Sequence, residues 1–312
     1  MDTIETRLSR IQKNISLASY TTFKIGGPAK YFLVVKSKEE LIEAVKIAKK
    51  CGVPFFVLGG GSNILFSDKG YSGLVAKCQM SDVRCQNNKI HAESGAIFGK
   101  VIMDSVNAGL SGLECGMGIP GTIGGAVCGN AGAYGHDISE FVESVEVFDG
   151  EKIIQLDNKQ CEFGYRESIF KKNHNLIILS VIFKLQPASK EESQKIIKDV
   201  LASRKGKIPA FPSSGCFFKN IILAEHPEKF QAMIPKEKIK GGKIGTGFLI
   251  DQCGLRGKQI GGAKVSEQHG NFIVNFANAT AQDILELAKF CKKAVKEKFG
   301  IDLKEETRLV GF

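Results

Sequence analysis

Apolar and polar positions along the first third of the chain predict a strand–helix–strand unit. The run 31–35 (YFLVV) predicts a short buried strand. Ser37 and Glu40 have the spacing of a capping box, and apolar residues then recur at helical intervals, at Leu41, Ile42, Val45 and Ala48. A second strand, 53–58 (VPFFVL), leads into the glycine turn 59–63 (GGGSN). A tight connection would explain one such glycine, but three in succession favour a ligand site at the strand end.

The later pattern predicts a further sheet and a hinge. Short strands are expected between residues 73 and 92, and the nearly continuous apolar runs 142–148 and 176–185 are typical of a sheet covered on both faces. Helical patterns fill three further segments, 96–108, 189–204 and 280–300. The composition then changes at 205–214 (KGKIPAFPSS), which favours a boundary between domains.

Residues 112–135 (GLECGMGIPGTIGGAVCGNAGAYG) show neither a helical nor a strand period. Nine of these 24 residues are glycine. Such density is costly in backbone entropy, and it is tolerated where the backbone turns through positive φ or approaches a ligand closely. Successive N–H groups in such turns form anion sites, so a phosphate group is the expected ligand. An irregular surface loop remains the alternative.

Several common motifs are excluded by their context. Residues 116–121 (GMGIPG) match the dinucleotide fingerprint G-x-G-x-x-G, which should follow a buried strand and open a helix. Here Pro120 and the glycines that follow are expected to oppose a helix, so a Rossmann turn is rejected. The chain also lacks a P-loop and a G-x-S-x-G nucleophile elbow.

Composition narrows the class of protein. The 312 residues are 43% apolar and 24% charged, which is typical of a globular protein of two or three domains. The nine cysteines are scattered and the five histidines form no ligand-like pair, so reduced thiols and no metal site are expected. The N-terminus does not resemble a signal peptide, and no apolar run approaches the ~18 residues of a membrane span, so a cytoplasmic location is expected.

The formal net charge of +10 suits an anionic partner. The lysines are dispersed, however, and no nucleic-acid-binding motif or repeat is visible. A small-molecule anion is therefore favoured over nucleic acid or a membrane surface.

Taken together, the motifs resemble the UDP-N-acetylenolpyruvoylglucosamine reductase (UDP-N-acetylmuramate dehydrogenase) family over nearly the whole chain. The resemblance rests on motifs in the family's order: TTFKIGGPA at 21–29, GGGSN at 59–63, GIPGTIGGA at 118–126 with GAYG at 132–135, FGYRES at 163–168, FFKN at 217–220, IDQCGLRGKQIGGAKVSEQHGNFIVN at 250–275, and KEETRLVG at 304–311. The interval between Arg166 and the strand 176–185 leaves no room for a tyrosine-bearing insertion, so the chain resembles the shorter, type II branch.

The resemblance implies an α+β fold with three parts. Two subdomains, 1–78 and 79–204, form an FAD-binding unit of the vanillyl-alcohol-oxidase type. Residues 205–303 form a substrate domain, and the tail 304–312 packs back near the first subdomain. The implied reaction reduces UDP-N-acetylglucosamine enolpyruvate to UDP-N-acetylmuramate, a step of peptidoglycan precursor synthesis, with FAD as cofactor and NADPH as reductant.

The resemblance also implies three catalytic residues. Arg166 of FGYRES matches the arginine that binds the substrate carboxylate, and Glu306 of KEETR matches the carboxylate that assists the same intermediate. Cys216 stands where the family usually has a serine proton donor. An ordinary thiol ionises near pH ~8.5, far below an alkanol, so Cys216 is expected to donate the proton.

Binding residues are carried over in the same way. Those expected to bind FAD are Gly59, Gly60, Gly61, Ser62, Asn63, Gly118, Pro120, Gly121, Thr122, Gly124, Gly125, Gly132, Ala133 and Tyr134. Those expected to bind substrate are Lys219, Asn220, His269 and, more loosely aligned, Lys207. Asn220 is followed by Ile221 in place of the usual proline, which puts the local loop geometry in question.

Two alternatives stay open. The chain could be another FAD oxidoreductase of the same fold with a different substrate, or a non-catalytic nucleotide or nucleic-acid binder. For the leading interpretation, a monomer is expected.

Overall fold

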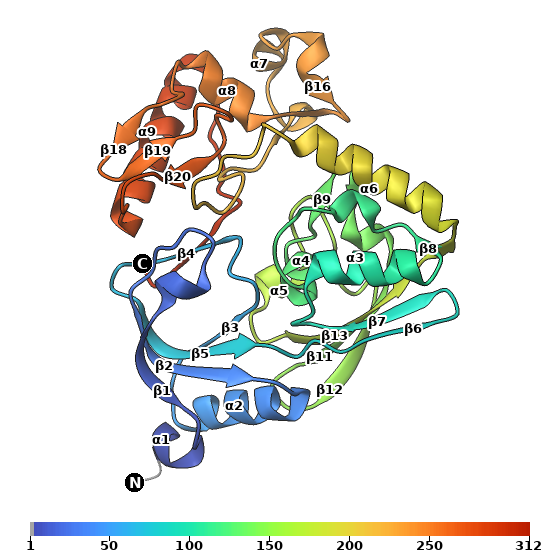
Figure 1. Cartoon of the computed structure of the whole chain (residues 1–312). Coiled ribbons are helices and arrows are strands. Elements are labelled where there is room, and N and C mark those ends of the chain that lie inside the picture. Colours follow the sequence, from blue (N-terminus) through green and yellow to red (C-terminus); the bar gives the residue numbers. More distant parts are fainter. Residues whose placement is uncertain (1–2) are drawn as a thin grey trace. The chain divides into compact units, whose positions relative to one another are not determined.

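The computed structural model describes residues 3–312 and divides into two compact units (Figure 1). Unit 1 contains residues 3–15, 29–60 and 72–204, and unit 2 contains 16–28, 61–71 and 205–312. The chain therefore leaves unit 1 twice before the hinge at 205. The second of these crossings falls inside the GGGSN turn, between Gly60 and Gly61.

The first sheet of unit 1 has the strand order β1-β2-β5-β3. Its elements are α1 (Ile4–Arg7), β1 (Gln12–Ser16), β2 (Pro28–Val35), α2 (Lys38–Lys50), β3 (Phe55–Leu58) and β5 (Tyr71–Cys78). α2 lies along this sheet, where its buried residues Leu41, Ala44, Val45 and Ala48 join the apolar side chains of β2 and β5 (Figure 1). β5 lies between β2 and β3 and runs parallel to β3.

The second sheet of unit 1 has the order β12-β11-β13-β7-β6, and all its pairs are antiparallel. Its strands are β6 (Val83–Gln86), β7 (Lys89–Glu93), β11 (Val142–Phe148), β12 (Ile153–Asp157) and β13 (Ile177–Lys184). The helical and short elements of this region are α3 (Phe98–Asn107), β8 (Leu110–Ser111), η2 (Glu114–Gly116), α4 (Ile123–Cys128), β9 (Gly132–Ala133), β10 (His136–Asp137), η3 (Ile138–Glu140), α5 (Ile169–Lys172), β14 (Gln186–Pro187) and α6 (Lys190–Arg204).

Unit 2 is built around the long helix α9 (Ala281–Phe299) and a three-stranded sheet, β18-β19-β20. Its other elements are η1 (Leu17–Tyr20), β4 (Ile64–Phe66), β15 (Ile221–Ile222), η4 (Leu223–Glu225), α7 (Glu228–Ala232), η5 (Lys236–Lys238), β16 (Ile239–Lys240), β17 (Lys243–Ile244), α8 (Thr246–Gln252), β18 (Gln259–Ile260), β19 (Ala263–Val265), β20 (Ile273–Asn275) and β21 (Arg308–Val310). Residues of both inserted segments, among them Phe23 and Leu65, belong to the core that α9 covers.

Side-chain caps explain where the main helices begin. Capping boxes are present at α9, between Thr280 and Asp283, and at α6, between Ser189 and Glu192. At α2 the box is only half formed. The Ser37 side chain accepts a hydrogen bond from Glu40 N at 3.3 Å, but the Glu40 carboxylate turns to the backbone N–H of Lys36. That carboxylate still satisfies a backbone donor just before the helix.

The expectation of a stretch without helix at 112–135 is wrong at one point. Residues 123–128 (IGGAVC) form α4, with Thr122 at its N-cap. Ile123, Ala126 and Val127 are buried in the core of the second sheet, so tertiary packing overrides the low helix propensity of Gly124 and Gly125. The segment before it is the 3-10 turn η2 rather than a buried strand, which leaves the rejection of a Rossmann turn unchanged.

Candidate active site

Two glycine turns of unit 1 pack directly against each other. A Cβ atom placed on Gly59 would lie 2.4 Å from Thr122 Oγ1, and one on Gly60 would lie 2.6 Å from Gly121 Cα. No side chain fits at either position, because backbone and a buried hydroxyl occupy the space. The turn after β3 and the turn before α4 therefore form one surface, the glycine cradle, defined by Gly59, Gly60, Gly121 and Thr122.

The glycine cradle contains a polar atom without a partner. Thr122 is 6% exposed, and within residues 3–312 its buried Oγ1 has no hydrogen-bond partner. Buried hydroxyl groups normally find one, so an unsatisfied group at a close-packed turn points to a ligand. The cradle thus offers a buried hydroxyl donor, which suits a phosphate oxygen.

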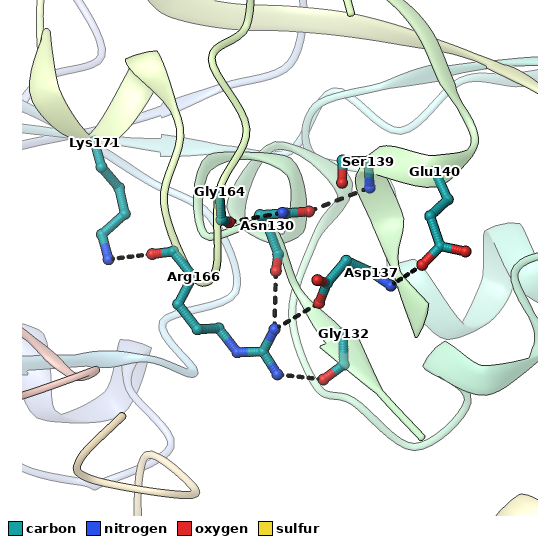
Figure 2. Close-up of polar contacts among 8 residues, drawn as sticks. All are labelled: Asn130, Gly132, Asp137, Ser139, Glu140, Gly164, Arg166 and Lys171. Carbon is teal, nitrogen blue, oxygen red and sulfur yellow. Dashed lines mark hydrogen bonds and ion pairs between the residues drawn. The ribbon is translucent and has the colours of Figure 1, made fainter. Parts of the chain in front are cut away.

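The next glycine turn holds the Arg166 side chain (Figure 2). Its guanidinium donates from Nη1 to the carbonyl of Asn130 at 3.1 Å and to Asp137 Oδ1 at 2.9 Å, and from Nη2 to the carbonyl of Gly132. The ring of Tyr165 lies 5.2 Å from the guanidinium carbon. Two backbone carbonyls, one carboxylate and an aromatic face thus hold this cation, and we call this group the arginine cage.

The arginine cage is itself held by hydrogen bonds (Figure 2). Asn130 donates through its side-chain amide to the carbonyl of Gly164 at 2.8 Å and accepts from Ser139 N at 3.2 Å. Lys171 donates to the carbonyl of Arg166 at 2.8 Å. Arg166 also has a φ of +56°, a left-handed conformation that is uncommon for a residue with a side chain. Such conformations cluster at functional sites, where surrounding structure enforces them.

In unit 2, the segments that carry Cys216 and Glu306 lie side by side. Glu306 N donates to the carbonyl of Phe217 at 2.8 Å, and Phe218 forms an antiparallel bridge with Glu305. Both Cys216 and Glu306 are half-buried. Backbone pairing therefore brings two of the three expected catalytic residues onto adjacent segments. Arg166 belongs to the other unit.

Buried polar side chains reinforce this pairing. Asn271 is 1% exposed, and its side-chain amide accepts from Phe218 N at 3.0 Å and donates to the carbonyl of Phe218 at 2.8 Å. Its own carbonyl accepts from Phe217 N at 2.8 Å. The hydroxyls of Ser214 and Thr307, both buried, lie 2.7 Å apart and link the same two segments. We call the Asn271 contacts with Phe217 and Phe218 the amide clamp.

The expected substrate residues lie in different surroundings within unit 2. Asn220 accepts through Oδ1 from Thr246 N at 3.3 Å, and the carbonyl of Lys219 accepts from the Thr246 hydroxyl. His269 Nδ1 accepts from the backbone N–H of Asn271 at 3.2 Å, which leaves the ring proton on Nε2 in the neutral form. Burial lowers the pKa of His269, so the neutral imidazole predominates at pH 7. Lys207 is exposed and follows α6.

Comparison with known proteins places the chain in a family. Residues 207–310 match the family model described as UDP-N-acetylenolpyruvoylglucosamine reductase, C-terminal domain, and residues 29–154 match the model described as FAD binding domain. The chain is 36% identical over 302 residues to the UDP-N-acetylenolpyruvoylglucosamine reductase of Solibacter usitatus, and the alignment covers 96% of this chain and 97% of that protein. The chain belongs to the UDP-N-acetylenolpyruvoylglucosamine reductase family.

Further relatives agree with this assignment. The reductase of Clostridium botulinum strain Alaska E43 is 39% identical over 308 residues, with 97% of this chain and 94% of that protein aligned. The crystal structure of the UDP-N-acetylenolpyruvylglucosamine reductase (MurB) of Thermus caldophilus superposes with a TM-score of 0.76 at 34% identity. The superposition covers 96% of this chain and 98% of the Thermus caldophilus chain. The expected family and the expected α+β fold with an FAD-binding unit are confirmed.

The glycine cradle lies in the region that matches the FAD binding domain, and its residues fit the cofactor. Gly59 and Gly60 let the two turns pack together, and the unpartnered Thr122 hydroxyl is a donor that suits a diphosphate oxygen. In residues 3–312, no group of three or more His, Cys, Asp or Glu side chains is placed to hold a metal ion. In the same residues, no helix is long and apolar enough to cross a membrane.

Sequence reasoning missed the residues that hold the expected catalytic groups in place. These are Asn130, Asp137, Ser214, Asn271 and Thr307. Asn130 lies within the glycine stretch and Asp137 just after it. The sequence therefore offered a weak indication that these two residues lie near a functional group. Nothing in the sequence pairs Asn271 with Phe218 or Ser214 with Thr307, because these contacts join distant segments.

Proposed function

We propose that the chain is an FAD-dependent oxidoreductase that reduces the enolpyruvyl group of UDP-N-acetylglucosamine enolpyruvate, with NADPH as reductant, to give UDP-N-acetylmuramate for peptidoglycan synthesis. Family membership over nearly the whole chain is the observation that carries this proposal. The arginine cage and the paired segments of Cys216 and Glu306 supply groups with the chemistry that the reaction requires.

The glycine turns would hold FAD, whose chemistry when bound would be hydride transfer from NADPH to one carbon of the enolpyruvyl double bond. Negative charge then develops on the adjacent carbon and in the substrate carboxylate. Arg166 binds that carboxylate, because a guanidinium fork holds two oxygens in fixed geometry. A preorganised cation is effective here since it need not reorganise as the charge develops.

Cys216 donates the proton that completes the reduction. The thiol S–H gives its proton to the carbon next to the one that received the hydride, so that two hydrogens are added across the double bond. Glu306, on the paired segment, assists the same intermediate. The resulting thiolate recovers a proton from solvent before the next turnover. Lys219, Asn220, His269 and Lys207 bind the nucleotide sugar in this assignment.

The glycine turns bind the cofactor in this proposal. The residues assigned are Gly59, Gly60, Gly61, Ser62 and Asn63 of the first turn, Gly118, Pro120, Gly121, Thr122, Gly124 and Gly125 of the second, and Gly132, Ala133 and Tyr134 of the third. Backbone N–H groups of these turns, other than that of Gly124, which donates to the Ser94 carbonyl at 2.8 Å, would bind the diphosphate together with the Thr122 hydroxyl.

The remaining assignments are also proposals. The domain boundaries are 1–78, 79–204 and 205–303, with 304–312 as a returning tail. The enzyme works as a monomer in the cytoplasm, a reducing compartment that suits nine free thiols. The molar mass measured by light scattering during size-exclusion chromatography tests the oligomeric state.

An anaerobic colour experiment tests the function. Purified protein should be yellow, lose its 450-nm absorbance with about one equivalent of NADPH, and recover it when UDP-N-acetylglucosamine enolpyruvate is added, because flavin absorbance reports its oxidation state. Protein that neither holds nor takes up FAD would contradict the proposal. Bleaching without recovery would instead indicate an FAD oxidoreductase with a different substrate.

A further inference from the structure

A lysine outside every motif discussed above reaches the glycine cradle from β5. Lys77 pairs with Leu58 in the parallel register of β3 and β5. Its ammonium therefore lies where β3 ends, and it donates a hydrogen bond to the carbonyl of Gly59, the first residue of the GGGSN turn. The carboxyl end of a parallel strand is a common ligand position in sheets of this kind.

The charge of Lys77 has no counter-ion in the described part of the chain. Across residues 3–312 its hydrogen-bond acceptor is the neutral Gly59 carbonyl, and no carboxylate contributes to its electrostatic surroundings. The side chain is half-buried, and this burial lowers the pKa of the ammonium. An ammonium has three donors, of which the Gly59 carbonyl takes one. A partly desolvated cation with donors to spare favours an anion beside it.

Thr122 meets the same residue from the other turn. Its unpartnered Oγ1 lies against Gly59 Cα, where a Cβ would come within 2.4 Å. One hydroxyl donor and one ammonium thus converge on Gly59 from two separate elements, β5 and the N-cap of α4. Thr122 is 6% exposed and its Oγ1 is buried, so this hydroxyl is an independent sign of a missing acceptor.

We propose that Lys77 supplies the fixed positive charge of the cofactor's diphosphate subsite, with the Thr122 hydroxyl as its neighbouring donor. This inference rests on the proposed function, since the anion is the diphosphate of FAD. Backbone N–H groups alone offer partial charges, whereas the ammonium adds a full charge in a partly desolvated place. The glycine motifs do not include Lys77, because it lies on β5, in a separate part of the sequence.

The substitution Lys77→Met tests the charge while keeping most of the side-chain length. We expect its dissociation constant for FAD to rise about 10- to 100-fold, the usual effect of losing a hydrogen bond to a charged group. Riboflavin lacks the diphosphate, so its affinity for deflavinated protein should stay within about twofold of wild type. Lys77→Arg keeps the charge and should retain most of the FAD affinity.

Thr122→Val provides a second measurement at the same subsite, with an expected loss of FAD affinity of about 3- to 10-fold, the size of one neutral hydrogen bond. Lys100→Met is the matched control, because Lys100 is an exposed lysine of the same unit that pairs with Asp104 at 2.7 Å. It should bind FAD as the wild type does. Quenching of flavin fluorescence on titration of deflavinated protein measures each constant.

Four outcomes of these titrations decide whether Lys77 serves the diphosphate subsite. Selective loss of FAD affinity in Lys77→Met supports the proposal. Unchanged FAD affinity overturns it, and so does an equal loss of FAD and riboflavin affinity with a lower melting temperature of the deflavinated protein, which indicates a structural role for Lys77. In both overturning cases wild-type turnover with NADPH and the enolpyruvyl substrate leaves the proposed function standing. Wild-type protein that does not bind FAD overturns both.

Discussion

Unit 1 and unit 2 position their candidate catalytic groups by different means. In unit 1, Arg166 is held by side-chain hydrogen bonds to the carbonyls of Asn130 and Gly132 and to the Asp137 carboxylate. In unit 2, Cys216 and Glu306 are placed by backbone pairing, and the amide clamp of Asn271 reinforces it. One unit fixes the direction of a cation, and the other fixes two stretches of main chain.

The difference suggests where each unit is sensitive to mutation. A cage of acceptors around a guanidinium determines charge and direction, so changes in the cage should affect catalysis more than folding. Asn271 of the amide clamp is 1% exposed and satisfies main-chain donors and acceptors. The loss of its side chain should therefore affect stability as well as catalysis. Four substitutions test this contrast.

The largest effect is expected from Cys216→Ala. Removal of the proton donor should slow substrate reduction by about 10²- to 10⁴-fold, the usual contribution of general acid catalysis. Flavin reduction by NADPH should be unchanged, since that step needs no proton from Cys216. Stopped-flow absorbance at 450 nm separates the two half-reactions. Cys216→Ser, which keeps a donor, is the control, and unchanged turnover in Cys216→Ala would remove the assignment.

Arg166→Lys should reduce the rate of substrate reduction by about 10²-fold, because an ammonium keeps the charge but cannot form the bidentate fork. The free energy of unfolding should change little, since the cage is only partly buried. Urea titration and stopped-flow kinetics measure the two quantities. Arg256→Lys, at an exposed arginine paired with Asp251, controls for general loss of an arginine. A large loss of stability without a kinetic effect would contradict the contrast between the units.

Asn271→Ala should combine both effects. Its loss leaves Phe218 N and the Phe218 carbonyl without buried partners, at a cost of about 1–3 kcal/mol for each unsatisfied group. Substrate reduction should slow while flavin reduction by NADPH is retained, because the clamp holds the Cys216 segment of unit 2. Thr307→Val breaks the nearby hydroxyl pair and should destabilise by only ~1 kcal/mol. Equal slowing of both half-reactions would indicate general damage instead.

The smallest effect is a pH dependence of stability that arises in unit 2. Burial lowers the pKa of His269 below its ordinary value of 6.5, with Asp251 opposing and Arg256 reinforcing the shift. As the pH falls through 6.5, the unfolded chain takes up the proton before the folded one. The contribution of His269 to stability is therefore complete above that pH and is lost progressively below it.

Urea titrations at about pH 7.5 and pH 5.5 check this dependence. His269→Asn should lose less stability than the wild type over that interval. Identical losses in the two proteins would show that His269 does not titrate as its burial implies.

Much of the fold was predictable from local signals. The capped helices α6 and α9 and the buried strand β13 follow from side-chain chemistry and periodicity within their own segments. Helix α4 could not be predicted from its own segment. Tertiary burial of Ile123 and Val127 outweighs the poor helix propensity of its two glycines. The small elements between Ile221 and Lys243, including η4, α7 and η5, carry no strong period, and their form depends on packing against the α9 core.

The sequence by itself determined the capped helices, the long apolar strands, the glycine turns and the family, because these depend on short-range patterns and on motifs in a set order. Only the tertiary structure decided which residues position the functional groups. The register of β3 and β5 brings Lys77 to Gly59, and antiparallel bridging brings the Glu306 segment to that of Cys216. These contacts follow from burial and from main-chain pairing between segments that are far apart in the sequence. No local sequence pattern predicts which distant segments will pair.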